Sequence, residues 1–338
     1  MDTIKYFLPD RQAPCVISPK GKSVEAPLDE VVSWLREQRI SLEAEILSTG
    51  GILLRGFKAI EDAKAFKAVI SAFSSQAATD EGSTSSRTAV LDRVYTSTDT
   101  PPYIPIELHQ ERSFHWEFPD KIAFFCDVPP YKGGETPIAD MRAVFKALPP
   151  EIIERFQTKG VRLRRRLPNV KIAGNQAVRT WQETFGTNSR SEVETLAAKL
   201  KWELNWSRFY LEIDNCVRPP CLTHPVTGDC VWFNQVNVLH KSNLSYWAKQ
   251  YKSWRLSCIA ILAPIIEQFY YYHHTHGDNS EIALTDLEQI RQAFASQKII
   301  FSWQKGDVLL LDNILMAHGR NCFEGARQLL VGLIENEN

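Results

Sequence analysis

Residues 303–332 read WQKGDVLLLDNILMAHGRNCFEGARQLLVG, and this stretch decides the fold. Two aliphatic runs of strand length, DVLLLD and QLLVG, flank a polar segment that contains the turn signal Glu324-Gly325. The pattern predicts two buried β-strands joined by a short connection. His318 follows the first run and Arg327 opens the second. Both side chains are therefore expected on a β scaffold.

The chain before this stretch alternates between strand-like and helix-like patterns. Apolar and β-branched runs predict strands over 52–57, 88–98, 106–111, 121–128, 133–140, 209–213, 230–236 and 299–303. Apolar positions at helical spacing predict helices over 28–48, 61–74, 141–157 with a break at Pro149-Pro150, 190–204, 243–268 and 285–296. The order of these segments predicts a mainly β fold with helical insertions.

The composition is that of an ordinary globular protein with a substantial core, since 44% of the 338 residues are hydrophobic and 23% are charged. The 39 basic and 40 acidic side chains give a net charge of -1, which offers no general attraction to nucleic acid or to an anionic membrane. No apolar run approaches the roughly 18 residues that span a bilayer. A small-molecule partner is expected, and the protein is not expected in a membrane.

The seven cysteines are odd in number and irregular in spacing, and the first residues, MDTIKYFLPD, contain no apolar signal core. Both features favour a reducing cytoplasm. Cys216, Cys221 and Cys230 with His224 raise the alternative of a zinc site, but their spacing does not match the usual two-residue knuckles. The histidines of the run YYYHHTH, residues 270–276, are expected in solvent rather than on a metal.

A second set of chemically active residues stands far upstream of His318. His109 and Glu111 are two residues apart in a strand-like segment, so on a strand they share one face. Two imidazoles and a carboxylate form the facial set that non-haem Fe(II) oxygenases use. A His-x-Glu pair alone is more often a surface histidine beside a charge. The strand-like setting and the distal His318, which follows an aliphatic run, give the metal hypothesis its weight.

Arg327 adds a feature that suits a diacid ligand. A guanidinium is permanently charged and planar, so it can bind a carboxylate through two parallel hydrogen bonds. The alternative is a surface charge at a strand edge, a description that Arg320 fits better.

Taken together, these motifs resemble the taurine dioxygenase-like (TauD/TfdA) family of Fe(II)/2-oxoglutarate oxygenases. Within it they are similar to the branch of the syringomycin-pathway hydroxylase, which belongs to non-ribosomal peptide and antibiotic biosynthesis. The matching segments are LHQERSF (108–114), KIAFFCDVPPYKGGETPIADMR (121–142), VWFNQVN (231–237) and WQKGDVLLLDNILMAHGRNCFEGARQLLVGL (303–333). As an ordered set they are far more specific than any single motif.

The resemblance implies a double-stranded β-helix, or jelly-roll, covered by helices. It implies one domain over residues 1–338, with a helical segment at about 28–75, a core at about 87–335 and a helical insertion at about 180–300. It also implies that His109, Glu111 and His318 bind Fe(II), that Arg327 holds the distal carboxylate of 2-oxoglutarate with the hydroxyl of Thr136, and that O2 is the other cosubstrate.

Three departures from the family pattern narrow the expected substrate, cosubstrate contacts and reaction. Glu111 stands where many members have aspartate, a variation of the branch that acts on amino acids, and it favours an amino-acid-like substrate. Cys322 and Gln328 stand where relatives have a proline and a second arginine, which leaves Arg327 alone for the cosubstrate. The retained carboxylate favours hydroxylation over halogenation, because halogenating relatives carry a small residue there.

The expected function is therefore hydroxylation of an unactivated C–H bond of an amino acid, either free or tethered to a peptidyl carrier protein, with succinate and CO2 as coproducts. Desaturation or epoxidation of a related substrate is one alternative, and a catalytically silent jelly-roll binding protein is another, which the intact ligands disfavour. The candidates for substrate contact are polar residues near apolar segments, for which structural hydrogen bonding is the alternative: Arg93, Asn234, Gln235 and His240.

Overall fold

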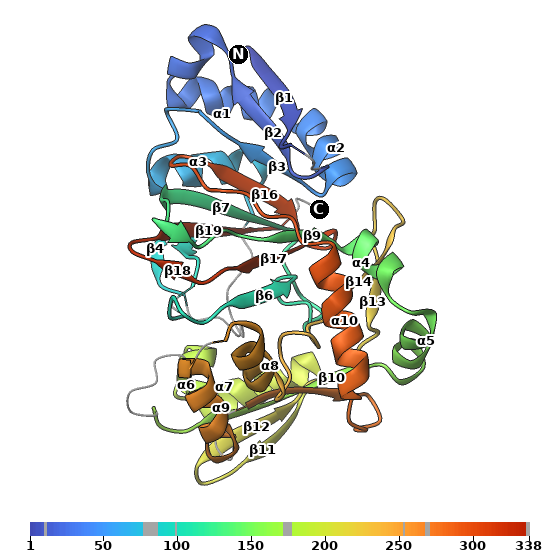
Figure 1. Ribbon diagram of the computed structural model, residues 1–338. Coiled ribbons are helices and arrows are strands. Elements are labelled where there is room, and N and C mark those ends of the chain that lie inside the picture. The colour runs from blue at the N-terminus through green and yellow to red at the C-terminus, as the bar shows by residue number, and fades with distance from the viewer. Residues whose placement is uncertain are drawn as a thin grey trace.

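The structure is a computed structural model of the chain, and it describes residues 1–9, 12–76, 87–98, 100–171, 178–252, 254–267 and 271–335. Figure 1 shows three levels. An N-terminal layer of helices and short strands lies at one end, the central sheets lie in the middle, and a separate four-stranded sheet with its own helices lies at the other end.

The largest sheet has eight strands within the described residues. Their spatial order is β1 (Thr3–Phe7), β2 (Cys15–Pro19), β3 (Gly51–Leu54), β16 (Val308–Asp312), β7 (Lys121–Val128), β19 (Gln328–Ile334), β5 (Val94–Thr96) and β4 (Ala89–Leu91). The two apolar runs of the C-terminal stretch become β16 and β19, which lie on either side of β7 and run antiparallel to it.

The central strands of this sheet, β3, β16, β7 and β19, are buried on both faces, which explains why they read as continuous apolar runs. Along β7, Ile122, Phe124 and Cys126 face the inner core, whereas Ala123 and Phe125 face the core beneath the N-terminal helices. The strands β16 and β19 alternate in the same way.

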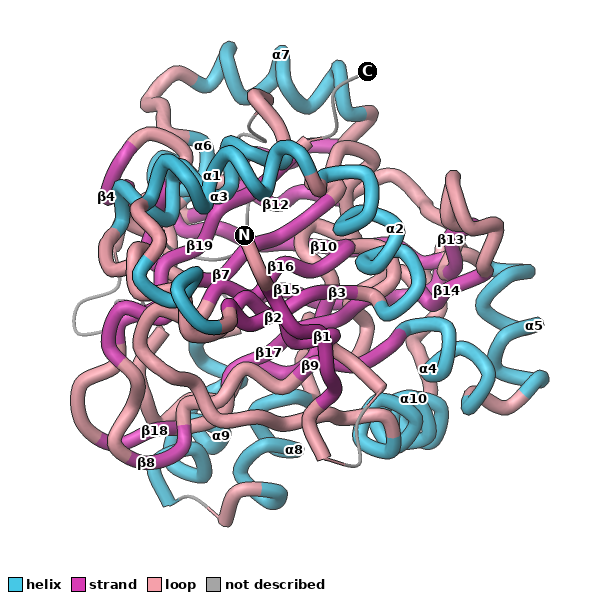
Figure 2. The backbone as a smooth tube through the Cα atoms, turned by 90° about the horizontal axis from the view of Figure 1, so that it is seen from above, coloured by secondary structure: helices cyan, strands magenta, loops and turns pink. Residues whose placement is uncertain are grey.

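The N-terminal layer consists of helices that cover the outer face of the large sheet. They are α1 (Leu28–Glu37), α2 (Arg39–Thr49) and α3 (Ala63–Phe73), preceded by the short 3-10 helix η1 (Gly21–Glu25). Figure 2 shows α1 and α3 crossing above the sheet. The helix predicted over 28–48 is broken at Gln38, where φ is -90° and ψ is 4°, so it forms two helices.

A smaller sheet faces the inner core from the opposite side. It consists of β6 (Ile106–His109), β17 (Met316–Arg320) and β9 (Ile138–Asp140), in that spatial order. Apolar residues of both sheets share one cluster, which includes Leu108, Phe124, Ala139 and Ala317. Two facing sheets with helical covers agree with the mainly β, jelly-roll fold that the sequence predicts.

The remaining elements surround these sheets. Two strand pairs are β8 (Lys132–Gly133) with β18 (Phe323–Glu324), and β13 (Cys221–Thr223) with β14 (Cys230–Trp232). The four-stranded sheet has the spatial order β11 (Glu203–Trp206), β12 (Tyr210–Asp214), β10 (Val161–Pro168) and β15 (Tyr271–His276). The helices are α4 (Met141–Ala147), α5 (Pro150–Lys159), α6 (Trp181–Phe185), α7 (Arg190–Leu200), α8 (Asn243–Gln250), α9 (Trp254–Ile266) and α10 (Leu284–Ser296). Figure 1 shows α10 running beside the central sheets toward the four-stranded one.

Two predicted elements differ in the structure because of contacts with distant parts of the chain. The helix predicted over 190–204 ends at Leu200, and Lys201 adopts a left-handed conformation with φ of 55°. Residues 203–206 then pair with β12 as a strand, so cross-strand pairing overrides local helical spacing. The strand predicted over 299–303 is wrong as well, because only Ile299 forms a bridge, to Ile138.

Candidate active site

The two histidines of the predicted metal set lie opposite each other on neighbouring strands. His109 on β6 is the register partner of His318 on β17, and their ring centroids are 4.5 Å apart. Glu111 lies near both rings, with its Oε2 atom 4.0 Å from Nε2 of His318. One donor atom from each of the three residues lies within 4.8 Å of the other two. The structure thus brings together a set separated by more than two hundred residues of chain.

Glu111 reaches this position from a turn and not from the strand face that its spacing predicts. The strand β6 ends at His109, and the chain turns immediately, with Arg112 at φ of 56°. The side chain of Asn313 holds this turn, because its Oδ1 accepts a hydrogen bond from the amide of Glu111 at 2.7 Å and its Nδ2 donates to the carbonyl of Glu111 at 3.0 Å. The turn therefore depends on the connection between β16 and β17.

The protonation states of the three residues suit metal binding. Burial lowers the pKa of His109 and His318 below the ordinary value, so both imidazoles are neutral near pH 7 and keep a lone pair. Burial alone would raise the pKa of Glu111, but the charge of Arg87 and its hydrogen bond to the carboxylate oppose this effect, and the pKa is lowered. Two neutral imidazoles and one carboxylate are the forms in which these groups bind a divalent cation.

Contacts around the rings fix their orientation. Nδ1 of His109 lies 2.9 Å from the carbonyl oxygen of Glu107, which leaves Nε2 free to face a metal. The ring of Phe124 on β7 packs against His318 with a centroid distance of 5.1 Å. Gly319 follows His318 at a close approach of the strands, since a Cβ there would lie 2.5 Å from the carbonyl oxygen of Ile106. A donor set of two imidazoles and a carboxylate, with Glu111 and His318 buried and His109 partly buried, fits Fe(II).

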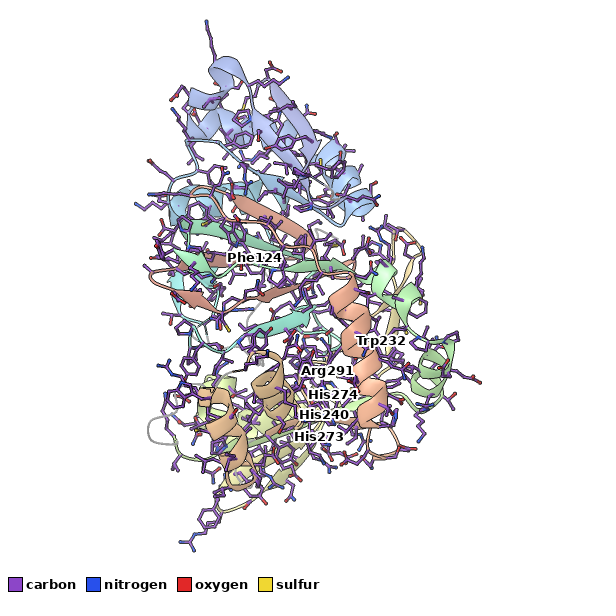
Figure 3. The ribbon with its side chains drawn as sticks, in the orientation of Figure 1. Phe124, Trp232, His240, His273, His274 and Arg291 are labelled. Carbon is purple, nitrogen blue, oxygen red and sulfur yellow. The ribbon has the colours of Figure 1, made fainter. Side chains whose placement is uncertain are left out.

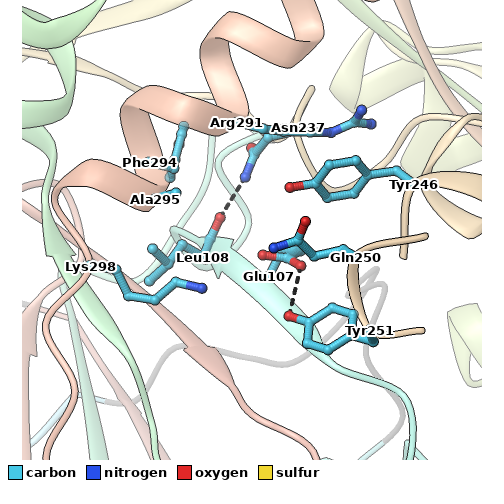
Figure 4. Close-up of a pocket in the computed structure, with 10 residues that line it drawn as sticks. All are labelled: Glu107, Leu108, Asn237, Tyr246, Gln250, Tyr251, Arg291, Phe294, Ala295 and Lys298. Carbon is cyan, nitrogen blue, oxygen red and sulfur yellow. Dashed lines mark hydrogen bonds between the residues drawn. The ribbon is translucent and has the colours of Figure 1, made fainter. Parts of the chain in front are cut away.

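Glu107 also lines a small pocket behind the metal set, shown in Figure 4. Its carboxylate accepts a hydrogen bond from the hydroxyl of Tyr251 at 3.2 Å, and the carbonyl of the neighbouring Leu108 accepts one from Asn237 at 2.8 Å. The pocket has a volume of about 50 Å³, enough for water molecules only. The hydrogen bond from Tyr251 links β6 to the end of α8.

Arg87 is a site residue that the sequence reasoning missed. Its Nη2 donates to Oε2 of Glu111 at 2.6 Å, and the side chains of Arg87 and Glu111 are 3% and 4% exposed. A buried arginine at this carboxylate keeps Glu111 ionised and limits its rotation. No motif or spacing in the sequence distinguishes Arg87 from the other arginines.

Arg327 lies just before β19, in the wall of a cavity of about 400 Å³. Its Nε donates to the carbonyl of Gly134 at 2.9 Å, which places the guanidinium beside the GGETP segment. In the same segment the hydroxyl of Thr136 accepts a hydrogen bond from Nε1 of Trp303 at 3.1 Å. Burial, followed by the charge of Arg320, lowers the pKa of Arg327 to about 10, so it stays charged at neutral pH.

Arg320 is not the surface charge that the sequence suggests. It is 4% exposed and lines the same cavity as Arg327. Its guanidinium donates to three backbone carbonyls, those of Thr100, Pro101 and Ile104. Carbonyl groups of a loop that is distant in the sequence accept hydrogen bonds from the buried guanidinium, so a local sequence pattern cannot predict that Arg320 is buried.

The four candidates for substrate contact have structural partners. Arg93 donates to the carbonyls of residues 74–76 at the end of α3, and Asn234 binds the carbonyl of Pro220 and the amide of Val236. Gln235 is the nearest to the metal set, because its Nε2 donates to the carbonyl of Gln110 at 2.8 Å. Gln110 itself donates to the carbonyls of Trp232 and Ile314.

His240 lies apart from the metal set, among other histidines. Figure 3 shows it near His273 and His274, away from Phe124, whose ring packs on His318. The expectation that the histidine run is exposed is wrong, because His273, His274 and His276 on β15 are all buried.

The zinc alternative finds no support among the described residues. His224 uses Nδ1 to accept from the amides of Val226 and Thr227, and its Nε2 lies 3.2 Å from Asp312. Within the described ranges, neither His224 nor any cysteine belongs to a group of three or more possible ligands.

Among all the residues that the structure describes, no helix has the length and apolar character that a membrane span needs.

Comparisons with known proteins agree with this geometry. The family model described as "Taurine catabolism dioxygenase TauD, TfdA family" matches residues 13–334. Dapdiamide synthesis protein DdaC of Enterobacter agglomerans is 35% identical over 293 residues, which are 86% of this chain and 84% of that protein. A clavaminate synthase-like protein of Arabidopsis thaliana is 27% identical over 327 residues, 95% of this chain and 93% of the relative.

Solved structures share the fold at low identity. Asparagine oxygenase in complex with Fe(II), 3-hydroxyasparagine and succinate superposes with a TM-score of 0.54 at 11% identity, over 95% of this chain and 93% of that one. PvcB, an iron- and α-ketoglutarate-dependent oxygenase from Pseudomonas aeruginosa, gives a TM-score of 0.50 at 14% identity, over 98% and 94%. The chain therefore belongs to the TauD/TfdA family and is a dioxygenase that uses Fe(II), 2-oxoglutarate and O2.

Proposed function

We propose that this dioxygenase hydroxylates an unactivated C–H bond of an amino acid or an amino-acid derivative in a biosynthetic pathway. The observation that carries the proposal is the set of His109, Glu111 and His318, of which Glu111 and His318 are buried, with one donor atom from each within 4.8 Å of the others. In this proposal the three residues bind Fe(II), and Arg327 binds the distal carboxylate of 2-oxoglutarate with help from Thr136.

The proposed reaction and substrate class rest on Glu111 and on the similarity to a dapdiamide synthesis protein. A carboxylate in the third ligand position supports hydroxylation, because it fills the position that a halide would need. Glutamate at that position is typical of the branch that acts on amino acids. The similarity to a dapdiamide synthesis protein supports a biosynthetic role. Free and carrier-tethered amino acids are both compatible with these features.

The protein's own residues have three tasks in this reaction. When bound, the iron would activate O2, which oxidises both 2-oxoglutarate, to succinate and CO2, and the C–H bond of the substrate. His109, His318 and Glu111 hold the metal in a position that burial shields from water. Arg87 keeps Glu111 ionised and oriented, and Arg327 gives the dicarboxylate a fixed direction.

The first test is spectroscopic and needs no substrate. Anaerobic addition of Fe(II) and 2-oxoglutarate should produce a weak visible charge-transfer band in the wild-type protein and a much weaker one in Arg327→Gln. A well-folded, metal-loaded wild type that gives no band would contradict the proposal and favour a silent binding protein.

The second test finds the substrate. Amino acids, free and loaded on a peptidyl carrier protein, are screened for substrate-dependent succinate release, and products are weighed by mass spectrometry. Hydroxylation adds the mass of one oxygen atom, whereas desaturation removes two hydrogen atoms. Succinate release with a product of the second kind would replace hydroxylation by desaturation.

A further inference from the structure

The helix α9 is apolar along its whole length and yet lies at the surface. Of its 13 residues, WRLSCIAILAPII, only Arg255 is charged. Trp254, Ile261, Leu262 and Ile265 are each between 52% and 76% exposed. Figure 1 shows α9 next to α8, at the end of the molecule that holds the four-stranded sheet. A helix that is apolar on all sides is normally buried, so a partner is expected to cover this one.

Four exposed residues of α9 have the spacing of a helix-pairing stripe. Trp254, Cys258, Ile261 and Ile265 are separated by four, three and four positions, which is the alternating spacing of a coiled-coil core. All four are exposed, and at 3.6 residues per turn they lie along one line at the centre of the outward face. Pro264 lies beside this line and not in it. We call these four residues the α9 stripe, and side chains at this spacing interlock with those of a second helix.

The α9 stripe is symmetric about its own midpoint. If a second α9 lies antiparallel to the first, Trp254 faces the partner subunit's Ile265, and Cys258 faces the partner subunit's Ile261. Each contact then occurs twice, as the two-fold axis of a homodimer requires. A large side chain meets a smaller one in both kinds of contact, and the dipoles of the two helices are opposed, which is favourable. The stripe is therefore complementary to itself.

The charges at the two ends of α9 are complementary in the same arrangement. The exposed Lys252 stands two positions before the stripe, and Glu267 stands two positions after it. An antiparallel pair therefore brings Lys252 toward the partner subunit's Glu267, whereas a parallel pair would bring like charges together. Burial raises the pKa of Glu267, and the charge of Lys241 opposes this effect. A further cation near this carboxylate would be favourable for the same reason.

The exposed apolar area is sufficient for a dimer. Burial of the stripe and of Leu262 on two chains removes on the order of 1,000 Å² from water, the size that a specific interface needs. Arg255 lies over the ring of Trp254 at 5.6 Å, and these two residue types often contribute most to binding energy. Arg255 also lies 5.4 Å from the ring of Tyr103. The surface thus borders the loop whose residues 100–102 line the cavity of Arg327.

We propose that the α9 stripe is a homodimer interface, in which two copies of this chain pair their α9 helices in antiparallel fashion. A lipid surface and a different protein are the competing occupants. Lipid surfaces bind helices that have a strongly basic polar face, whereas α9 contains a single charged residue. A different protein has no need for a stripe and end charges that match their own copies. The symmetry of the surface therefore favours a second copy.

The test measures self-association of the full chain by analytical ultracentrifugation over a range of concentrations. The wild type should form a dimer. Ile261→Asp puts a charge at the centre of the stripe and should raise the dimer Kd by at least about 30-fold. Ile40→Asp is the matched control, because Ile40 is 87% exposed on another helix, α2, and its replacement should leave the Kd unchanged. Both sites are exposed, so both variants should fold, which circular dichroism checks.

A charge exchange tests the antiparallel order. Lys252→Glu would bring carboxylates together at both ends of the interface and should raise the Kd by about two- to tenfold. Lys252→Glu/Glu267→Lys restores opposite charges and should return the Kd toward the wild-type value. A double variant that associates more weakly than Lys252→Glu would show that the helices are not antiparallel.

Three outcomes would overturn the homodimer. One is a wild type that stays monomeric at the highest concentration measured. Another is a dimer that Ile261→Asp does not weaken, because a different surface would then hold the chains together. The third is an equal loss of association in Ile261→Asp and Ile40→Asp. A monomeric wild type that sediments with phospholipid vesicles, when Ile261→Asp does not, would assign α9 to a lipid surface instead.

Discussion

His109 and His318 are direct register partners across β6 and β17, and their ring centroids lie 4.5 Å apart. The register of one strand pair therefore sets the distance between two of the three proposed metal donors. Any change that shifts these strands relative to each other also changes the metal site.

Replacing His318 by alanine should abolish iron binding and succinate formation. The substitution removes one of three donors, and its effect on metal affinity should exceed the roughly 10- to 100-fold effect of losing a ligand's partner. Iron content and substrate-dependent succinate release are measured, with circular dichroism as the control for folding. Full turnover by a folded His318→Ala protein would show that the ligand assignment is wrong.

Replacing Arg87 by alanine should shift the pH dependence of metal binding. The charge of Arg87 lowers the pKa of Glu111, so its loss raises that pKa and protonation begins at a higher pH. The acid limb of the Fe(II)-binding profile should therefore move to higher pH. Arg87→Lys keeps the charge and should move it less. Identical acid limbs in all three proteins would mean that Arg87 does not act on Glu111.

Replacing Arg327 by glutamine should weaken 2-oxoglutarate binding without loss of iron. A charged, paired hydrogen bond to a carboxylate contributes roughly 2–3 kcal/mol, which corresponds to about a 30- to 150-fold change in Kd. Titration of the Fe(II) protein with 2-oxoglutarate, followed by the visible band, gives the Kd. An unchanged Kd would require another residue to hold the distal carboxylate.

Replacing Asn313 by alanine should lower both stability and metal affinity. The side chain bonds the amide and carbonyl of Glu111 and also the carbonyl of Pro119 at 2.8 Å, all in buried surroundings. Leaving these groups unsatisfied should cost about 2–4 kcal/mol in the free energy of unfolding. Urea denaturation measures the loss. Asn313→Asp keeps the acceptor for the amide of Glu111 but sets a buried carboxylate oxygen against the carbonyls of Glu111 and Pro119, so it should not restore stability. Wild-type stability in either variant would exclude this role.

The metal-free protein should lose stability as the pH falls below about 6.5. Burial lowers the pKa of His274 to about 4 and that of His240 to about 3, whereas both titrate near 6.5 in the unfolded chain. The unfolded state therefore takes up protons first, and each histidine reduces the free energy of unfolding by up to about 1.4 kcal/mol per pH unit. Denaturation curves measured with a chelator should show this slope, and His274→Gln should make it shallower. Equal slopes would mean that His274 titrates normally.

The sheets and the candidate metal donors could be predicted from the sequence because their signals are local. The runs of β16 and β19 are apolar over residues 308–311 and 329–334, as is typical of strands buried on both faces, and His318 follows the first run. Glu111 could be selected from its spacing to His109, although the spacing wrongly placed it on the strand.

The features that the sequence could not reveal depend on distant partners. Arg320 has the appearance of a surface charge until the carbonyls near Thr100, 220 residues away, are seen to accept its hydrogen bonds. Arg87 gains its meaning only from contact with Glu111. The histidines of β15 look solvent-exposed in a polar run, yet they are buried, in contact with β10, Phe156, Leu239 and His240. In each case long-range contacts determine burial, and residue type does not.

The bond between Asn313 and the turn of Glu111 joins residues that lie 202 positions apart. During synthesis, His109 and Glu111 emerge from the ribosome long before β17 is made. The nascent chain therefore cannot assemble the proposed metal site until synthesis is almost complete. Iron would consequently enter a chain whose sheets have already formed. A truncated product that ends before Asn313 should leave the ribosome without the ability to sequester iron.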